Sequence, residues 1–552
     1  MDAKATAASD SPYAKWTRES LLAHIKSLEA ELHKNQIPLP ALPSLAQPGG
    51  PPKAKKDKDA DGEKPPKKAK IVKDIDPSKY SSRYIALKLA YQGKRYGGFE
   101  YQESQELSTI EDELWKALTR TRLIYPKDVN VVDFSCCEYS KCGRTDRGVS
   151  AFGQVITLRV RSNRPLPKAE AESDSMQVDD SGEPTAPKPK KEWDPIRDEI
   201  RYCSVLNRVL PPDIRILAWY PDPPTDFVAR FSCRERQYRY FFTQPAYAPI
   251  PGPLQHNQSS NGWLDIERMR TAAKMFEGLH DFRNFSKADP SKLRTNFERR
   301  MFEVDVVEVP EGSAEMAYLQ SSVLRPTVGP VAQTQLDANP HGTKMYYFSV
   351  KGSAFLWHQI RCMVYVLFLV GQGLEEPSVI RDLLDVKKNP ARPAYPMADD
   401  VPLVLWDCIF PAENDPERRD AVPWIWADAD EPNALAFSRN GNLEALWSEW
   451  RAKKMDELLA AQLLQMVANQ GQTPRILQDA DQAREILGDK ALPPRIFDGG
   501  NTGFFGPKTY IPLAKLKKGV PVEEANDAYA RKNGFADAKE MRLKKGYRES
   551  AE

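Results

Sequence analysis

The chain has 552 residues, enough for about two to four domains and a large hydrophobic core. Lys and Arg number 79 against 77 Asp and Glu, so the net charge of +2 does not by itself indicate a nucleic-acid binder. The longest apolar run, Met363–Val370, is far shorter than the roughly 18 residues of a membrane span. Residues 1–16 lack the apolar core of a signal peptide, so we expect a soluble protein of the nucleus or cytoplasm.

The N-terminal part predicts a helix followed by a linker. Four apolar residues between Leu21 and Leu32 recur at helical spacing, which predicts an amphipathic helix within residues 1–36. This helix could form a coiled-coil seam, or it could dock on its own domain or on RNA. Residues 37–79 are rich in Pro, Lys and Asp and predict a disordered basic linker. Its lysine clusters, Lys53–Lys58 and Lys67–Lys70, suit nuclear import, phosphate binding or a solvated run without function.

Residues 80–245 predict an N-terminal subdomain in which strands and helices alternate. Strands are expected at residues 83–93 and 153–161, and Ser108 opens a capping-box helix that runs to Arg120. Residues 162–194 are polar and Pro-rich, which predicts a disordered insertion. A helix and then a strand are expected between residues 199 and 220, so the flanks of the insertion are joined into one domain.

Residues 246–411 predict a C-terminal subdomain, and residues 412–552 a helical and basic extension. Just before it, residues 227–244 suggest a long bent strand or hairpin, and helices are expected at 266–278 and 355–373. This mixed order, with strands arriving in neighbouring pairs, predicts an α+β fold with a large mixed, mainly antiparallel sheet.

The seven cysteines contain no C-x-x-C pair. Cys136, Cys137 and Cys142 lie close together, but no His or Cys cluster nearby completes a zinc set. The spacing therefore predicts reduced thiols and no metal site.

The segment KCGRTDRGVSAFGQV, residues 141–155, places Asp146 between Arg144 and Arg147 in a glycine-bounded turn. Neighbouring guanidinium groups keep a carboxylate ionised, which suits a nucleophile or an electrostatic stabiliser. A turn held by salt bridges is the structural alternative. An aspartic-protease loop fails because Thr145 precedes the Asp, and Phe152 breaks a G-x-S-x-G elbow. No P-loop and no G-x-G-x-x-G follows a strand, so we expect no nucleotide or dinucleotide cofactor.

Residues 143–155 closely resemble the catalytic loop of the tRNA pseudouridine synthase I family. The resemblance extends over about residues 82–411. Its other blocks stand in the family's order, at residues 86–102, 227–242, 278–287, 352–364 and 402–410.

This resemblance implies two pseudo-related α/β subdomains with a catalytic cleft between them, tRNA as substrate, a homodimer, and a reaction that needs no cofactor or metal. Arg147, where many relatives carry Ala, points to the eukaryotic branch that modifies tRNA positions 38 and 39. Two alternatives stay open: a synthase of the same family with other RNA targets, and a non-catalytic tRNA-binding chaperone.

The resemblance also implies roles for individual residues. Asp146 would be the nucleophile, and Arg144 would fill the position that the flipped uridine vacates. Tyr238 would stack on the flipped base, although Tyr240 lies two residues along the strand and would share its face. Arg361 would pair with the catalytic carboxylate.

Further residues are expected to contact the substrate. Either Leu403 or Leu405 would form the apolar wall of the pocket. Basic side chains near these blocks would contact phosphates without reading bases. They are Lys94, Arg95, Arg230, Arg234, Arg236, Arg239, Arg294, Arg299 and Arg300.

Overall fold

The computed structural model describes residues 76–104, 106–166, 193–248, 262–310, 344–427, 442–478, 480–488, 496–500 and 510–546. The predicted N-terminal helix, almost all of the predicted linker and most of the insertion lie outside these residues, as does part of the C-terminal extension. All described residues belong to one compact unit, Ile75–Glu552.

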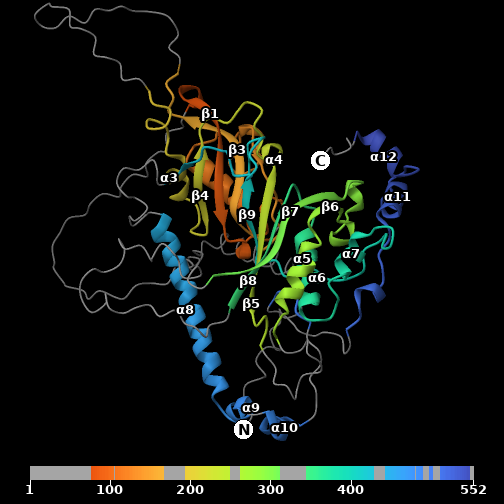
Figure 1. The fold of residues 1–552 in the computed structure, drawn as a ribbon. Helices are drawn as coiled ribbons and strands as arrows, with labels where there is room; N and C mark the ends of the chain where they lie inside the picture. Colours follow the sequence, from red (N-terminus) through yellow and green to blue (C-terminus); the bar gives the residue numbers. More distant parts are fainter. Residues whose placement is uncertain are drawn as a thin grey trace, which may run out of the picture. The chain divides into compact units, whose positions relative to one another are not determined.

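One mixed sheet of ten strands organises the described part of the chain (Figure 1). The strands are β1 (Ser81–Tyr91), β2 (Ser140–Lys141), β3 (Ser150–Ser162), β4 (Ile214–Tyr220), β5 (Glu235–Gln244), β6 (Gly278–Asp281), β7 (Glu298–Glu308), β8 (Lys344–Gly352), β9 (Leu403–Ile409) and β10 (Ile425–Trp426). Their order is β10-β4-β1-β3-β9-β5-β8-β7-β6, and β2 pairs with β3 beside this path. Only the pair β3–β9 among them is parallel, so the predicted α+β class with a mixed, mainly antiparallel sheet is confirmed.

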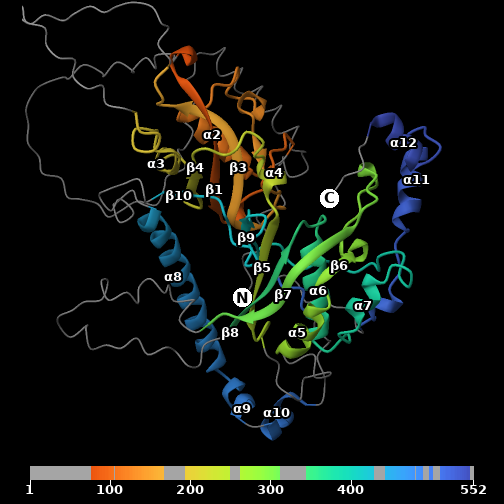
Figure 2. The same ribbon diagram turned by 45° about the horizontal axis from the view of Figure 1, so that its top comes forward.

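Helices α2 to α7 lie between strands along the chain, and α8 to α12 follow the last strand. They are α2 (Ile110–Arg120), α3 (Tyr202–Asn207), α4 (Ala229–Ser232), α5 (Ile266–Lys274), α6 (Gln359–Gly371), α7 (Val379–Leu384), α8 (Asn442–Ala468), α9 (Thr473–Gln478), α10 (Ala480–Leu487), α11 (Val522–Lys532) and α12 (Ala538–Lys545). Figure 2 shows α5 and α6 beside β7 and β8, and α5 contacts both α6 and β7. The C-terminal helices confirm the predicted helical extension. None of the described helices combines the length and the hydropathy needed to cross a membrane.

Two predicted elements have different bounds in the structure. Residues 227–244 contain a single helical turn, α4, before β5, because the amide of Arg234 first pairs with the carbonyl of Ile409 and strand pairing starts there. The helix predicted to end near Gly278 ends at Lys274. The residues from Gly278 onward instead pair with β7 at the edge of the sheet.

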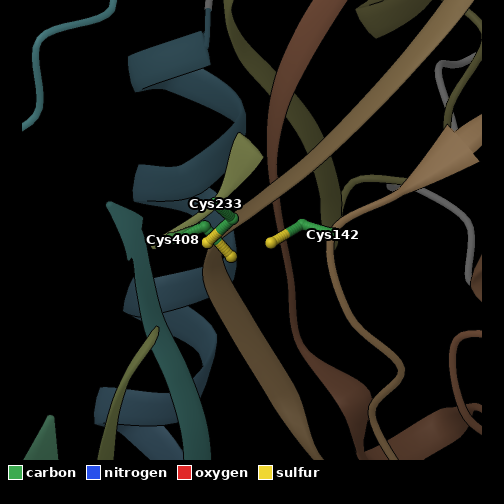
Figure 3. Close-up of side chains that lie close together, drawn as sticks. All are labelled: Cys142, Cys233 and Cys408. Atoms are coloured by element: carbon green, nitrogen blue, oxygen red, sulfur yellow. The ribbon is translucent and has the colours of Figure 1, made fainter. Parts of the chain in front are cut away.

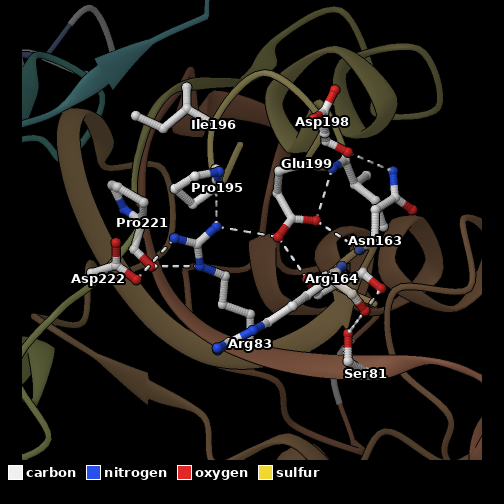
Figure 4. A network of polar contacts seen from close by, with 12 residues as sticks. Ser81, Arg83, Asn163, Arg164, Pro195, Ile196, Asp198, Glu199, Pro221 and Asp222 are labelled. Atoms are coloured by element: carbon white, nitrogen blue, oxygen red, sulfur yellow. Dashed lines mark hydrogen bonds and ion pairs between the residues drawn. The ribbon is translucent and has the colours of Figure 1, made fainter. Parts of the chain in front are cut away.

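The two flanks of the insertion meet in a polar network around Arg83 and Glu199 (Figure 4). The Arg83 guanidinium contacts Glu199 at 3.2 Å and Asp222 at 2.8 Å. The buried Glu199 carboxylate accepts hydrogen bonds from the Ser162 hydroxyl and the Asn163 amide, at 2.6 and 2.8 Å. These bonds join the end of β3 to the segment that resumes after the insertion.

Candidate active site

The loop that carries Asp146 connects β2 to β3 and is held at both sides by buried polar groups. The side chain of Gln154, 0% exposed, bonds both the amide and the carbonyl of Gly143. The Thr145 hydroxyl lies 2.8 Å from the Tyr91 hydroxyl, and its carbonyl accepts the Phe99 amide at 3.1 Å. Gln154 therefore has a structural role, because its hydrogen bonds to Gly143 fix the start of the loop.

Two glycines after β1 allow the backbone to lie directly on this loop. A Cβ on Gly93 would stand 2.1 Å from the carbonyl oxygen of Val149. Gly98 has a φ of +119°, and its Cβ would stand 3.0 Å from the carbonyl oxygen of Thr145. Only glycine leaves room for the two backbone segments to come this close, so these two residues help to fix the position of the loop that carries Asp146.

The sheet brings the predicted blocks together at one place. β3 begins immediately after the loop and pairs in parallel with β9, Ser150 opposite Val404. On the other side of β9, Tyr238 of β5 lies opposite Leu405. The beginning of α6 completes a cavity of about 670 Å³ whose lining includes Asp146, Arg144, Tyr238, Leu403, His358 and Arg361.

Asp146 is accessible from this cavity, and its side chain is 36% exposed. Its carboxylate lies 3.5 Å from Nε2 of His358. The prediction of guanidinium groups on either side was wrong: the described part of the chain has no ion pair between Asp146 and Arg144 or Arg147. Arg144 instead pairs with Glu100 at 3.1 Å at the rim, where its side chain is 57% exposed.

Arg361 lines the cavity, but its predicted ion pair with Asp146 is not formed. Its guanidinium pairs with Asp400 at 3.6 Å and donates from Nε to the carbonyl of Ala398 at 2.7 Å. The segment before β9 lies across the first turn of α6, since the Ala398 amide bonds the Arg361 carbonyl at 3.1 Å. Because of this crossing, the carboxylate nearest to the Arg361 guanidinium is that of Asp400 and not that of Asp146. Burial raises the pKa of Asp400, and the charge of Arg361 opposes that rise.

His358 is a site residue that sequence reasoning missed. It was expected within a helix, whereas α6 begins at Gln359 and His358 precedes it with a φ of 60°. This left-handed conformation is unusual for a residue other than glycine and directs the ring toward Asp146. Burial lowers the pKa of His358, while the carboxylate of Asp146 acts in the opposite direction. The imidazole is therefore neutral at neutral pH. The sequence signal that could have identified His358 is its position in the block at residues 352–364, which also contains Arg361.

The titration of His358 can be checked by NMR. We expect its midpoint below the ordinary value of 6.5, and a still lower midpoint in Asp146→Asn, because that variant removes the charge that raises the pKa. The unfolded chain binds this proton more tightly, so His358's contribution to stability is lost as the pH falls below about 6.5. An unchanged His358 midpoint in the variant would contradict the contact.

The structure distinguishes Tyr238 from Tyr240 and Leu403 from Leu405, the two pairs of residues between which the sequence left a choice. Tyr238 and Leu403 line the cavity. Tyr240 is 0% exposed and packs against Phe368, and Leu405 is also 0% exposed. Burial raises the pKa of the Tyr238 hydroxyl, so the ring enters the cavity as a neutral phenol.

The predicted phosphate contacts fall into groups. Arg230 and Arg236 line the cavity, but Arg236 donates to the carbonyls of Ser353, Cys142 and Arg230. Lys94, Arg95 and Arg234 are exposed outside its lining, and Arg95 pairs with Asp213. Arg239 lies over the rings of Tyr347 and Trp406 and does not line the cavity. Arg294 lines a smaller neighbouring pocket, while Arg299 and Arg300 lie on β7.

An exposed aromatic ring, Trp357, was not among the predicted contacts. Its side chain is 44% exposed and lines the cavity. The ammonium groups of Lys287 and Lys292 lie 5.0 and 5.8 Å from its ring centroid. An aromatic face flanked by cations is an arrangement that binds stacked bases and their phosphates.

Comparison with known proteins agrees with this geometry. A family model described as tRNA pseudouridine synthase matches residues 272–411. The chain is 38% identical over 385 residues to a tRNA pseudouridine(38/39) synthase of Homo sapiens, a match that covers 70% of the chain and 64% of that protein. The chain thus spans less than two thirds of the human relative. It is 33% identical to the tRNA pseudouridine(38/39) synthase of Saccharomyces cerevisiae over 526 residues, 95% of the chain and 93% of the relative. The chain therefore belongs to the tRNA pseudouridine synthase family.

Proposed function

We propose that the protein isomerises uridine to pseudouridine in tRNA, with Asp146 as the nucleophile. The observation that carries the proposal is the position of Asp146 in a cavity shared with Arg144, Tyr238 and Leu403, which come from separate blocks of the chain. A carboxylate that is open to the cavity and not paired with a guanidinium is available to a substrate.

The reaction breaks the N1–C1′ bond of uridine, turns the base and joins C1′ to C5. Substrate and product contain the same atoms, and the hydrogen on C5 exchanges with solvent. Asp146 would act on the sugar or base while Tyr238 stacks on the detached uracil. Arg144, which pairs with Glu100 at the rim, would enter the space left by the extruded nucleotide. Arg361 would then act through Asp400, as a residue that positions the wall of the cavity.

Positions 38 and 39 are the proposed targets, supported by the names of the relatives and by Arg147. The division into related subdomains at residues 80–245 and 246–411, the homodimer and the nuclear or cytoplasmic location stay predictions. In support of related halves, β1 pairs antiparallel with β3 and β4, and β5 pairs antiparallel with β8 and β9. β5 ends at Gln244, before the predicted boundary, so this strand pattern would start the second half at β5 and not at residue 246.

Tritium release from tRNA that carries 5-tritiated uridine tests the proposal, together with mapping of the pseudouridine formed. We expect release from the wild-type protein, and pseudouridine at positions 38 and 39. Release with modification elsewhere would assign other targets. Tight tRNA binding without release would instead identify a binding protein.

Trp357→Ala is expected to weaken tRNA binding. Loss of one stacked base costs about 1–3 kcal/mol, so the dissociation constant should rise by about 5- to 150-fold. Fluorescence anisotropy with labelled tRNA measures this change. Trp263→Ala removes another exposed ring, 53% exposed, that does not line the cavity, and this variant should bind tRNA as the wild type does. Equal affinities of all three proteins would exclude a stacking role for Trp357.

A further inference from the structure

Three cysteines that are far apart in the sequence meet beneath the catalytic loop. Cys142 follows β2, Cys233 follows α4, and Cys408 belongs to β9. Their sulfur atoms all lie within 4.8 Å of one another, and Figure 3 shows the three side chains pointing toward a common centre. The residues are 2%, 5% and 0% exposed, respectively.

The spacing of the sulfur atoms suits a thiolate-bound metal ion. Zinc binds thiolate sulfur at about 2.3 Å in a tetrahedral arrangement, which separates the sulfur atoms by roughly 3.8 Å. Side-chain rotations can supply the contraction from the observed spacing. The backbone carbonyl of Glu235, 3.2 Å from the Cys233 sulfur, or a water molecule would supply the fourth ligand.

The charge around the cluster favours a divalent ion. Arg236 lies opposite Cys408 in the pairing of β5 with β9, so the two side chains share a face of the sheet. The guanidinium donates to three backbone carbonyls, among them that of Cys142 at 3.1 Å. It forms no ion pair with any carboxylate of the residues that the structure describes. Three thiolates and one Zn²⁺ together carry a single negative charge, which Arg236 balances.

We propose that Cys142, Cys233 and Cys408 bind one zinc ion. The ion ties the start of the catalytic loop to the segment before β5 and to β9, directly beside the cavity that Cys142 and Arg236 line. Its role is structural, and it takes no part in the isomerisation. Spacing along the chain predicted no metal site, because these ligands come from three separate segments.

Metal analysis of the full-length protein, purified under reducing conditions without chelator, tests the proposal. We expect about one equivalent of zinc per chain in the wild type and a loss of most of it in Cys233→Ala and Cys408→Ala. Cys203→Ala is the matched control, since Cys203 is also buried but lies in α3, outside the cluster, and it should keep the zinc.

A second measurement uses the wild-type chain alone, in case the variants do not fold. After removal of bound metal, titration with Co²⁺ should produce the thiolate charge-transfer and d–d bands of a tetrahedral site, and Zn²⁺ should abolish them. Absence of both native zinc and these bands would overturn the proposal. A disulfide between two of the three cysteines, found by peptide mass analysis of the reduced-purified protein, would also overturn it. Because metal content is measured without tRNA, this result is independent of the tritium-release assay.

Discussion

Asp146→Asn is expected to reduce tritium release from tRNA by at least about 10³-fold while tRNA affinity stays unchanged. Asparagine has nearly the same volume and keeps polar contact with His358, but it is far too weak a nucleophile to replace the carboxylate. Among the described residues, the carboxylate accepts no hydrogen bond from the loop, whose anchors there are Gln154 and Thr145. The change should therefore affect turnover and leave the fold intact.

The control for this variant is Asp222→Asn, which neutralises a carboxylate that is 75% exposed and lies outside the cavity. Its release rate should match that of the wild type. Substantial release from Asp146→Asn, with normal folding, would remove Asp146 from the role of nucleophile. Joint loss of affinity and release would instead assign it to substrate binding.

Gly93→Ala is expected to lower the free energy of unfolding by more than about 2 kcal/mol and to abolish most activity. The added methyl group would lie 2.1 Å from the carbonyl oxygen of Val149 and 2.8 Å from that of Gly148. Both contacts are with backbone, so no side-chain rotation can relieve them. The catalytic loop must move away from β1, and Asp146 moves with it. Urea unfolding and tritium release measure the two effects.

Gly143→Ala is the matched control because Gly143 belongs to the same loop and a Cβ there meets no atom within 4 Å. Its stability should stay within about 0.5 kcal/mol of the wild type. If Gly93→Ala were as stable as Gly143→Ala, the close packing of the two backbone segments would not be what holds the loop.

Much of the fold was predictable because its signals are local. The alternation of residue types in residues 83–93 and the apolar run of α6 identify those elements without any knowledge of their neighbours. The predicted bounds were wrong where pairing between distant segments determines where a strand begins or a helix ends. β5 begins at Glu235 because β9 is adjacent, and the helix before Gly278 ends early because β7 offers a partner for the following residues.

The site shows the same division. The resemblance predicts Asp146, Arg144, Tyr238 and Arg361 as site residues, and the structure brings all four to one cavity. It could not specify their charge partners. Arg361 forms its ion pair with Asp400 because the chain before β9 crosses α6. His358 contacts Asp146 because its backbone adopts a left-handed conformation. No periodicity reveals either arrangement.

The sequence by itself determined the class of fold, the family and the segment that carries the acidic residue, because each depends on residue types in a short or ordered pattern. Only the tertiary structure decided which side chains meet: His358 with Asp146, Arg361 with Asp400, and Cys142 with Cys233 and Cys408. These contacts join residues about 40 to more than 260 positions apart, so they follow from strand order and backbone direction, which no local pattern encodes.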